Sequence, residues 1–141
     1  MRKLAALALL VPAAAIAQMG GDMMNNPRHA YVTRHGIDPK YAGKHDPLRP
    51  GALNLEAGRK LYSRYCAACH GASGLGSEAG LKLDPPAARL MGLARTRIAS
   101  DAFYDWTIAE GGAPVGSAMP PFKDTLKPEQ IWKIVLFLRT L

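Results

Sequence analysis

Cysteine is scarce in this chain of 141 residues, which contains only Cys66 and Cys69. A small scaffold held together by several disulfide bonds is therefore excluded. The two cysteines are separated by two residues and followed at once by His70. Any role that they share must therefore be a local one, and no cysteine remains to cross-link distant parts of the chain.

Long hydrophobic runs are also missing from most of the chain. The C-terminal apolar run, from Ile131 to Leu138, is interrupted by Lys133 and followed by Arg139. A membrane-spanning helix needs about 20 predominantly apolar residues, so this run is too short and too charged to be one. We therefore expect a chain without a stable membrane span.

The N-terminal segment, residues 1–17, has the pattern of a secretory signal peptide. Arg2 and Lys3 precede an apolar run, which is followed by small residues that end at Ala17. The stretch is too short to span a bilayer comfortably, so an uncleaved anchor is the less favoured alternative. We expect cleavage near Ala17 and export, to the periplasm or an equivalent compartment.

Acidic residues are fewer than basic ones, 11 against 18, which gives a formal net charge of +7. The basic residues form no block and are not interleaved with aromatic residues, which make up 7% of the chain. Nucleic-acid binding is therefore not expected. A moderately basic surface instead suits an acidic face on a partner protein or an anionic lipid, where charge raises the encounter rate.

The segment CAACH, residues 66–70, has the spacing of an attachment site for covalently bound c-type haem. Two thiols one helical turn apart can each form a thioether, and His70 can reach the iron as proximal ligand. A redox dithiol would prefer a βαβ context and would leave His70 without a role. A zinc site usually needs four ligands, and the other histidines lie upstream without paired spacing, at His29, His35 and His45.

Residues 18–52 are predicted to form an irregular extension. They are rich in Gly, Asn, Pro, Arg and His, with turn signals such as Asn26-Pro27. Aromatic residues such as Tyr41 indicate that the extension could lie across the domain surface as a strap. Soft ligands for copper are present at Met19, Met23, Met24 and His29. A mobile terminus is the simpler interpretation of that group.

Three helices are predicted around the CAACH motif, over about 54–69, 100–111 and 128–141, each with a capping residue or proline at its start. Gly58 lies inside the first and costs about 1 kcal/mol relative to alanine, which is tolerable where another helix approaches closely. Trp106 is expected to pack inward in the second helix. Its indole N–H could donate to a haem propionate, although core packing is the more common role.

The loop of residues 111–122 contains a candidate second axial ligand, Met119. Pro120 and Pro121 restrict the backbone after it, and a thioether held in a restrained loop is a suitable soft ligand for haem iron. A methionine of the core is the alternative reading. Met91 competes for the role but lies in a predicted helical turn without a comparable loop, so Met119 is favoured.

With these features the chain resembles the class I c-type cytochromes, a family of small monohaem electron carriers. The resemblance covers roughly residues 53–141 and rests on GRKLY at 58–62, the CAACH motif, MPPF at 119–122 and the closing helix 130–141. It implies an all-α, small cytochrome c fold whose N- and C-terminal helices cross around one haem, after the irregular extension. The residues implied at the crossing are Gly58, Tyr62, Ile134 and Phe137.

The resemblance also implies the roles of individual residues. Cys66 and Cys69 would hold haem c, and His70 and Met119 would ligate its iron. Pro85 would lie on the proximal side, where a backbone carbonyl could orient His70 through its other ring nitrogen. With both axial positions filled, the iron has no vacant place for a substrate, so the expected function is one-electron transfer and not catalysis.

The expected partners are redox proteins with an acidic docking face, for which Lys82 and Lys123 are candidate contacts. The alternative is a haem subunit permanently attached to a periplasmic oxidoreductase, with the extension as its grip. A haem sensor or a peroxidase-like catalyst would need an open iron site, which the Met119 loop disfavours. Bis-histidine ligation is a further possibility, with His29, His35 or His45 in place of methionine.

Overall fold

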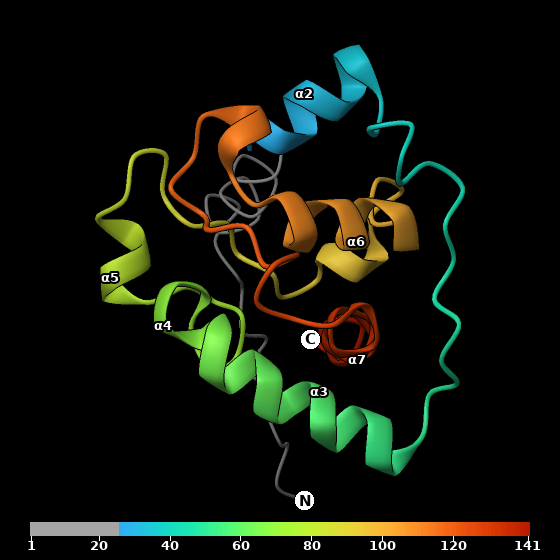
Figure 1. Cartoon of the computed structure of the whole chain (residues 1–141). Helices are drawn as coiled ribbons and strands as arrows, with labels where there is room; N and C mark the ends of the chain where they lie inside the picture. The colour runs from blue at the N-terminus through green and yellow to red at the C-terminus, as the bar shows by residue number, and fades with distance from the viewer. Residues whose placement is uncertain (1–25) are drawn as a thin grey trace, which may run out of the picture.

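The computed structural model describes residues 26–141, and every regular element within that range is a helix (Figure 1). The α-helices are α2 Pro27–His35, α3 Ala52–Tyr65, α4 Ala67–His70, α5 Glu78–Leu81, α6 Asp101–Glu110 and α7 Pro128–Leu138. Short 3-10 turns lie at Leu93–Arg95 (η1) and Ala113–Val115 (η2). Among these elements no helix is long and apolar enough to cross a membrane. The predicted signal peptide, its cleavage near Ala17 and the Met19, Met23 and Met24 group lie outside the described residues.

The most extensive packing between helices is the crossing of α3 and α7 (Figure 1). A side chain at Gly58 of α3 would collide with the backbone carbonyl of Lys133 in α7. One turn later, Tyr62 is 1% exposed and its ring centroid lies 5.2 Å from that of Phe137. The crossing that the sequence predicts at Gly58 and Tyr62 is therefore confirmed.

The helices α6 and α3 begin in different ways. At the start of α6 the Ser100 hydroxyl accepts a hydrogen bond from the Phe103 N–H at 3.1 Å, as its N-cap position predicts. The helix α3 begins earlier than the predicted cap at Asn54. Its N-cap is Gly51, and the Asn54 side chain instead donates to the Arg49 carbonyl at 3.0 Å.

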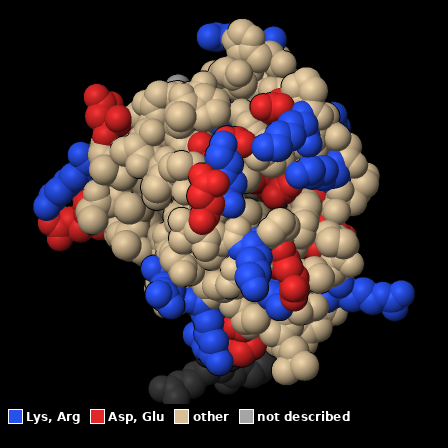
Figure 2. All heavy atoms as spheres, in the orientation of Figure 1, with Lys and Arg blue, Asp and Glu red and all other residues tan. Residues whose placement is uncertain are grey.

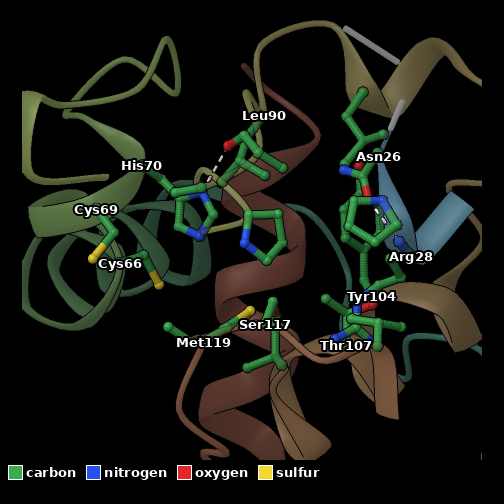
Figure 3. A pocket seen from close by; sticks show the side chains of 18 of the residues that line it. Asn26, Arg28, Cys66, Cys69, His70, Leu90, Tyr104, Thr107, Ser117 and Met119 are labelled. Carbon is green, nitrogen blue, oxygen red and sulfur yellow. Dashed lines mark hydrogen bonds between the residues drawn. The ribbon is translucent and has the colours of Figure 1, made fainter. Parts of the chain in front are cut away.

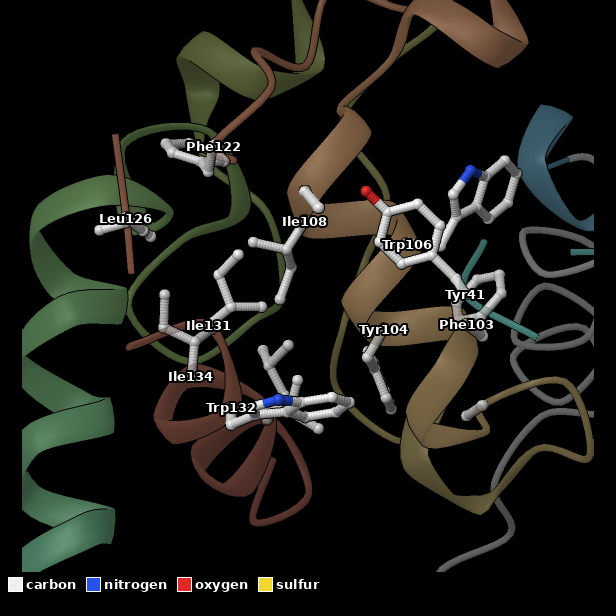
Figure 4. Packing of buried hydrophobic residues seen from close by; sticks show 14 of the residues in the cluster. Tyr41, Phe103, Tyr104, Trp106, Ile108, Phe122, Leu126, Ile131, Trp132 and Ile134 are labelled. Carbon is white, nitrogen blue, oxygen red and sulfur yellow. The ribbon is translucent and has the colours of Figure 1, made fainter. Parts of the chain in front are cut away.

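The hydrophobic core lies where α7 meets α3 and α6 (Figure 4). The helix α7 packs on more than one side, because six of its residues are buried: Ile131, Trp132, Ile134, Val135, Leu136 and Leu138. The helix α6 is buried along most of its length, and Trp106 is 1% exposed. The α7 helix therefore connects the segment that carries the CAACH motif to α6.

The extension is not irregular throughout, as the sequence predicted, because residues 27–35 form α2. The Asn26 side chain accepts a hydrogen bond from the Arg28 N–H at 2.9 Å, and Pro27 occupies the first turn. An Asn cap followed by proline is typical of a helix start as well as of a turn, and here the pair begins a helix. The rest of the extension has no regular structure until α3.

Two side chains of the extension attach it to α6. Tyr41 is 3% exposed, and its hydroxyl donates to the Glu110 carboxylate at 2.5 Å. Lys44 Nζ lies 2.9 Å from Oδ2 of Asp105, whose side chain is only 6% exposed. The extension therefore lies across the domain as a strap, and its buried residues belong to the core of the domain.

Replacing Lys44 with methionine is expected to lower the free energy of unfolding by about 2 kcal/mol, because it leaves the buried Asp105 carboxylate without its cation. Urea denaturation of the haem-loaded protein measures the change. Lys40→Met is the matched control, since Lys40 is 65% exposed and lies 3.8 Å from Glu110, and surface pairs contribute about 0–1 kcal/mol. Equal losses in the two variants would show that the Lys44 pair does not secure the strap.

Candidate functional site

A large cavity lies between the CAACH segment, the 111–122 loop and α2 (Figure 3). Its wall is mainly apolar and draws on several elements, with side chains such as Leu90, Phe103, Ile108, Phe122, Ile134 and Leu138. Apolar surface of this extent is unfavourable against water, so the cavity suits a large apolar group.

The CAACH segment brings its three functional side chains to this cavity. The helix α3 ends at Tyr65, Cys66 is its C-cap, and α4 continues from Ala67 to His70. Both cysteines and His70 line the cavity, and neither cysteine forms a disulfide bond. Burial, with a smaller contribution from Cys69, raises the pKa of Cys66 to about 12. An unreacted thiol at this position is therefore uncharged at neutral pH, as an apolar wall requires.

The imidazole of His70 is oriented by a backbone carbonyl. Its Nδ1 lies 2.8 Å from the carbonyl oxygen of Ala88. Because a carbonyl can only accept, Nδ1 carries the proton and Nε2 keeps its lone pair, as in a metal ligand. Burial lowers the pKa of His70, and the bond to Ala88 only partly opposes this effect. The resemblance implies that Pro85 lies on the side of His70 and that a backbone carbonyl there orients the imidazole. Pro85 lines the cavity, and the orienting carbonyl is that of Ala88.

The loop that carries Met119 is folded back on the end of α6. Gly111 has a positive φ of 64°, and a side chain there would collide with the backbone of Met119 and of the prolines after it. The Gly112 N–H donates to the Met119 carbonyl at 2.7 Å. The Met119 side chain lines the cavity. Met91, the competing candidate, is 47% exposed and is not part of the cavity wall.

The three histidines that the sequence offered as other ligands lie in different places. His29 lines the cavity, and its ring packs edge-on against Phe103 with centroids 6.1 Å apart. His35 is exposed on α2 beside Tyr31. The side chain of His45 is 88% exposed and lies 3.9 Å from Asp101. Among these histidines, His29 alone is on the cavity wall.

Sequence reasoning missed several polar residues of the cavity wall, namely Asn26, Arg28, Thr107 and Ser117. The only local signal for the first two is the Asn-Pro helix start, which places them at the start of α2 but does not indicate what α2 covers. The position of the other two depends on how α6 and the following loop pack. These residues could be found only from the folded chain.

The two lysines that the sequence proposed for docking are both paired with acids. Lys82 Nζ lies 2.7 Å from Glu78, and Lys123 Nζ lies 2.6 Å from Glu110. Figure 2 shows basic and acidic side chains interspersed over the face in view, without a broad patch of one sign. The arrangement of charges on this face therefore does not by itself indicate a partner with an acidic docking face.

Residues 53–138 match the protein family described as "Cytochrome C oxidase, cbb3-type, subunit III". The chain belongs to this family of c-type cytochrome domains. It is also 29% identical, over 93 residues and 65% of its length, to the quinohemoprotein alcohol dehydrogenase ADH IIB of Pseudomonas putida. It covers 12% of the length of that dehydrogenase. A solved structure of cytochrome CL from Methylophaga aminisulfidivorans matches with a TM-score of 0.49 at 19% identity, covering 79% of this chain and 65% of that one.

As a c-type cytochrome, the protein carries covalently bound haem c and transfers electrons. The predicted all-α cytochrome c fold, the haem cofactor and the electron-transfer function are confirmed. The residues of the cavity fit that group, because they provide an apolar wall, two thiols at the attachment spacing, and a neutral imidazole with one nitrogen available.

Proposed function

We propose that this cytochrome is an exported one-electron carrier with haem attached at Cys66 and Cys69 and its iron ligated by His70 and Met119. The observation that supports this proposal best is that the four side chains line one cavity, with His70 and Met119 reaching it from separate segments (Figure 3). When bound, haem c supplies an iron that cycles between the ferric and ferrous states.

Each residue of the proposed site has a defined task. Cys66 and Cys69 tether the cofactor, and the Ala88 carbonyl keeps Nε2 of His70 available as a ligand. Met119 supplies a soft sulfur, which favours ferrous iron and raises the reduction potential. The apolar wall excludes water, which tunes the potential further. No position is left for a substrate, so the protein relays electrons.

Visible spectra of the mature, haem-loaded protein test this ligation. We expect the oxidised protein to show the far-red band of a sulfur-to-iron bond, and the reduced protein to be indifferent to carbon monoxide. Both follow from two protein ligands that close the iron site. Absence of the band with ready binding of carbon monoxide would refute the proposal and favour a sensor or a catalyst. A strongly negative potential would instead favour ligation by His29.

We also propose that the mature protein acts in the periplasm after cleavage near Ala17, with residues 18–52 as the extension and 53–141 as the cytochrome domain. Loss of Arg2 and Lys3 on cleavage lowers the formal net charge from +7 to +5, and this positive balance supports a partner with an acidic docking face. Electron transfer with such a partner should slow as ionic strength rises, because salt screens the attraction. A rate independent of salt would refute the acidic face.

A second candidate is a haem subunit held permanently in a dehydrogenase, which the likeness to an alcohol dehydrogenase favours. The strap counts against the extension as a grip, because Tyr41 and Lys44 already contact α6 of the same chain. Size-exclusion chromatography of the periplasmic fraction separates the two. A free monomer supports the carrier, and co-elution with a stoichiometric partner supports the subunit.

A further inference from the structure

Arg28 is a buried cation for which the described residues provide no counter-ion. The residue is 6% exposed, and burial lowers the pKa of its guanidinium to about 10. Its Nη2 donates to the Gly111 carbonyl, and the guanidinium carbon lies 4.6 Å from the centre of the Trp106 ring. Its Nη1 is buried and has no hydrogen-bond partner among residues 26–141. Burying a charge without an anion is costly, so an anion is expected to bind at Nη1.

The position of Arg28 shows where that anion would lie. Arg28 lines the haem cavity, and among the described residues of the wall it is the one lysine, arginine, aspartate or glutamate. Figure 3 shows it with Asn26 and Thr107 on the side of the cavity away from Cys66 and Cys69. The two haem carboxylates, the propionates, are on the porphyrin edge opposite the groups that the cysteines attack. The cation is therefore on the side where the cofactor carries its charge.

Thr107 provides a second donor at the same place. Its Oγ1 is buried, and within the part of the chain that the structure describes it has no hydrogen-bond partner. Its backbone carbonyl accepts from the N–H of Gly111, whose own carbonyl binds Arg28. Thr107 and the Arg28 contact are thus one helical turn apart at the end of α6. A carboxylate can accept hydrogen bonds from a guanidinium and a hydroxyl together.

We propose that Arg28 and Thr107 bind a haem propionate, so that helix α2 of the extension completes the haem site from outside the family's matched region. The proposal rests on the haem attachment proposed above. It also reassigns the role that the sequence offered to Trp106. That indole is not part of the cavity wall and lies instead behind Arg28, stacked on Tyr31 with centroids 5.7 Å apart.

The proposed contact has consequences for the reduction potential. A guanidinium beside the propionate keeps it ionised and disfavours the extra positive charge of ferric iron. Without it, the desolvated propionate would take up a proton as the pH falls, and the potential would become pH-dependent. The other titratable groups on the wall are His29 on α2, Tyr65 on α3, Tyr104 on α6 and the motif itself. Burial raises the pKa of Tyr104 to about 12, so it stays neutral.

Redox titration of the haem-loaded protein between about pH 5 and pH 8 tests the proposal, together with carbon-13 NMR of haem labelled at the propionate carboxyls. In Arg28→Met we expect the propionate pKa to rise and the ferrous form to lose stability about tenfold at high pH, or ~59 mV for one electron. The potential should then fall as the pH rises. Arg28→Lys, which keeps the charge, should show a smaller change.

Arg34→Met is the matched control, because Arg34 lies exposed in the last turn of the same helix. It should leave the propionate pKa and the potential unchanged. If Arg28→Met does not mature, Thr107→Val gives the same readout, with a smaller expected rise in the propionate pKa. An unchanged propionate pKa in these variants would overturn the proposal, even with lower stability. The far-red band of the wild-type protein distinguishes failure of this proposal from failure of the proposed iron ligation. If the wild type lacks the band, the ligation itself is refuted.

Discussion

Met119→Ala is expected to abolish the far-red sulfur-to-iron band and to open the ferrous iron to carbon monoxide. It removes the thioether that we propose as sixth ligand, while the CAACH segment and its Ala88 contact stay in place. Because methionine favours ferrous iron, the potential should fall by more than ~59 mV, a tenfold change in the ferric–ferrous equilibrium. Visible spectra with and without carbon monoxide, followed by redox titration, measure all three effects.

Met91→Ala provides the matched control for this experiment. Met91 is 47% exposed and is not part of the cavity wall, so the same substitution there should leave the band and the potential unchanged. Loss of the band in the Met91 variant alone would reverse the assignment of the sixth ligand. Retention of the band in both variants would show that neither methionine binds the iron.

The candidate site could be predicted largely from sequence because its chemistry is concentrated in short segments. The spacing of Cys66, Cys69 and His70 is a local property of one helix end, and it places them on one cavity. Met119 could be favoured over Met91 because the glycines and prolines around it restrain one loop. Local covalent and backbone constraints of this kind can be recognised without knowledge of tertiary contacts.

Features that depend on distant contacts could not be predicted in this way. Arg28 is charged and precedes the CAACH motif in a segment rich in turn formers, so an exposed position was the reasonable expectation. Its burial depends on Gly111 and Trp106, and the Gly111 contact joins residues 83 positions apart. A backbone carbonyl that orients His70 could be predicted in the same way. Which residue supplies it could not, because that depends on the path of the chain before η1. Pattern and propensity contain no information on such pairings.

The prediction with the largest effect on stability concerns the helix crossing. Gly58→Ala is expected to lower the free energy of unfolding by about 2 kcal/mol or more, despite the ~1 kcal/mol gain in helix propensity. The added methyl group would collide with the backbone carbonyl of Lys133, and a backbone group cannot rotate away as a side chain can. The helices α3 and α7 would therefore have to separate along the crossing.

Gly51→Ala is the control, because nothing lies within 4 Å of a side chain at that position. The substitution replaces a glycine N-cap by a poorer one, so the expected loss is within about 1 kcal/mol. Urea denaturation of both haem-loaded variants gives the comparison. The helix α3 leads into the CAACH motif, and α7 contributes Ile134 and Leu138 to the cavity wall. Separation of the two helices should therefore also admit water to the haem and lower its reduction potential. Wild-type stability in Gly58→Ala would contradict the prediction and show that the crossing tolerates a methyl group.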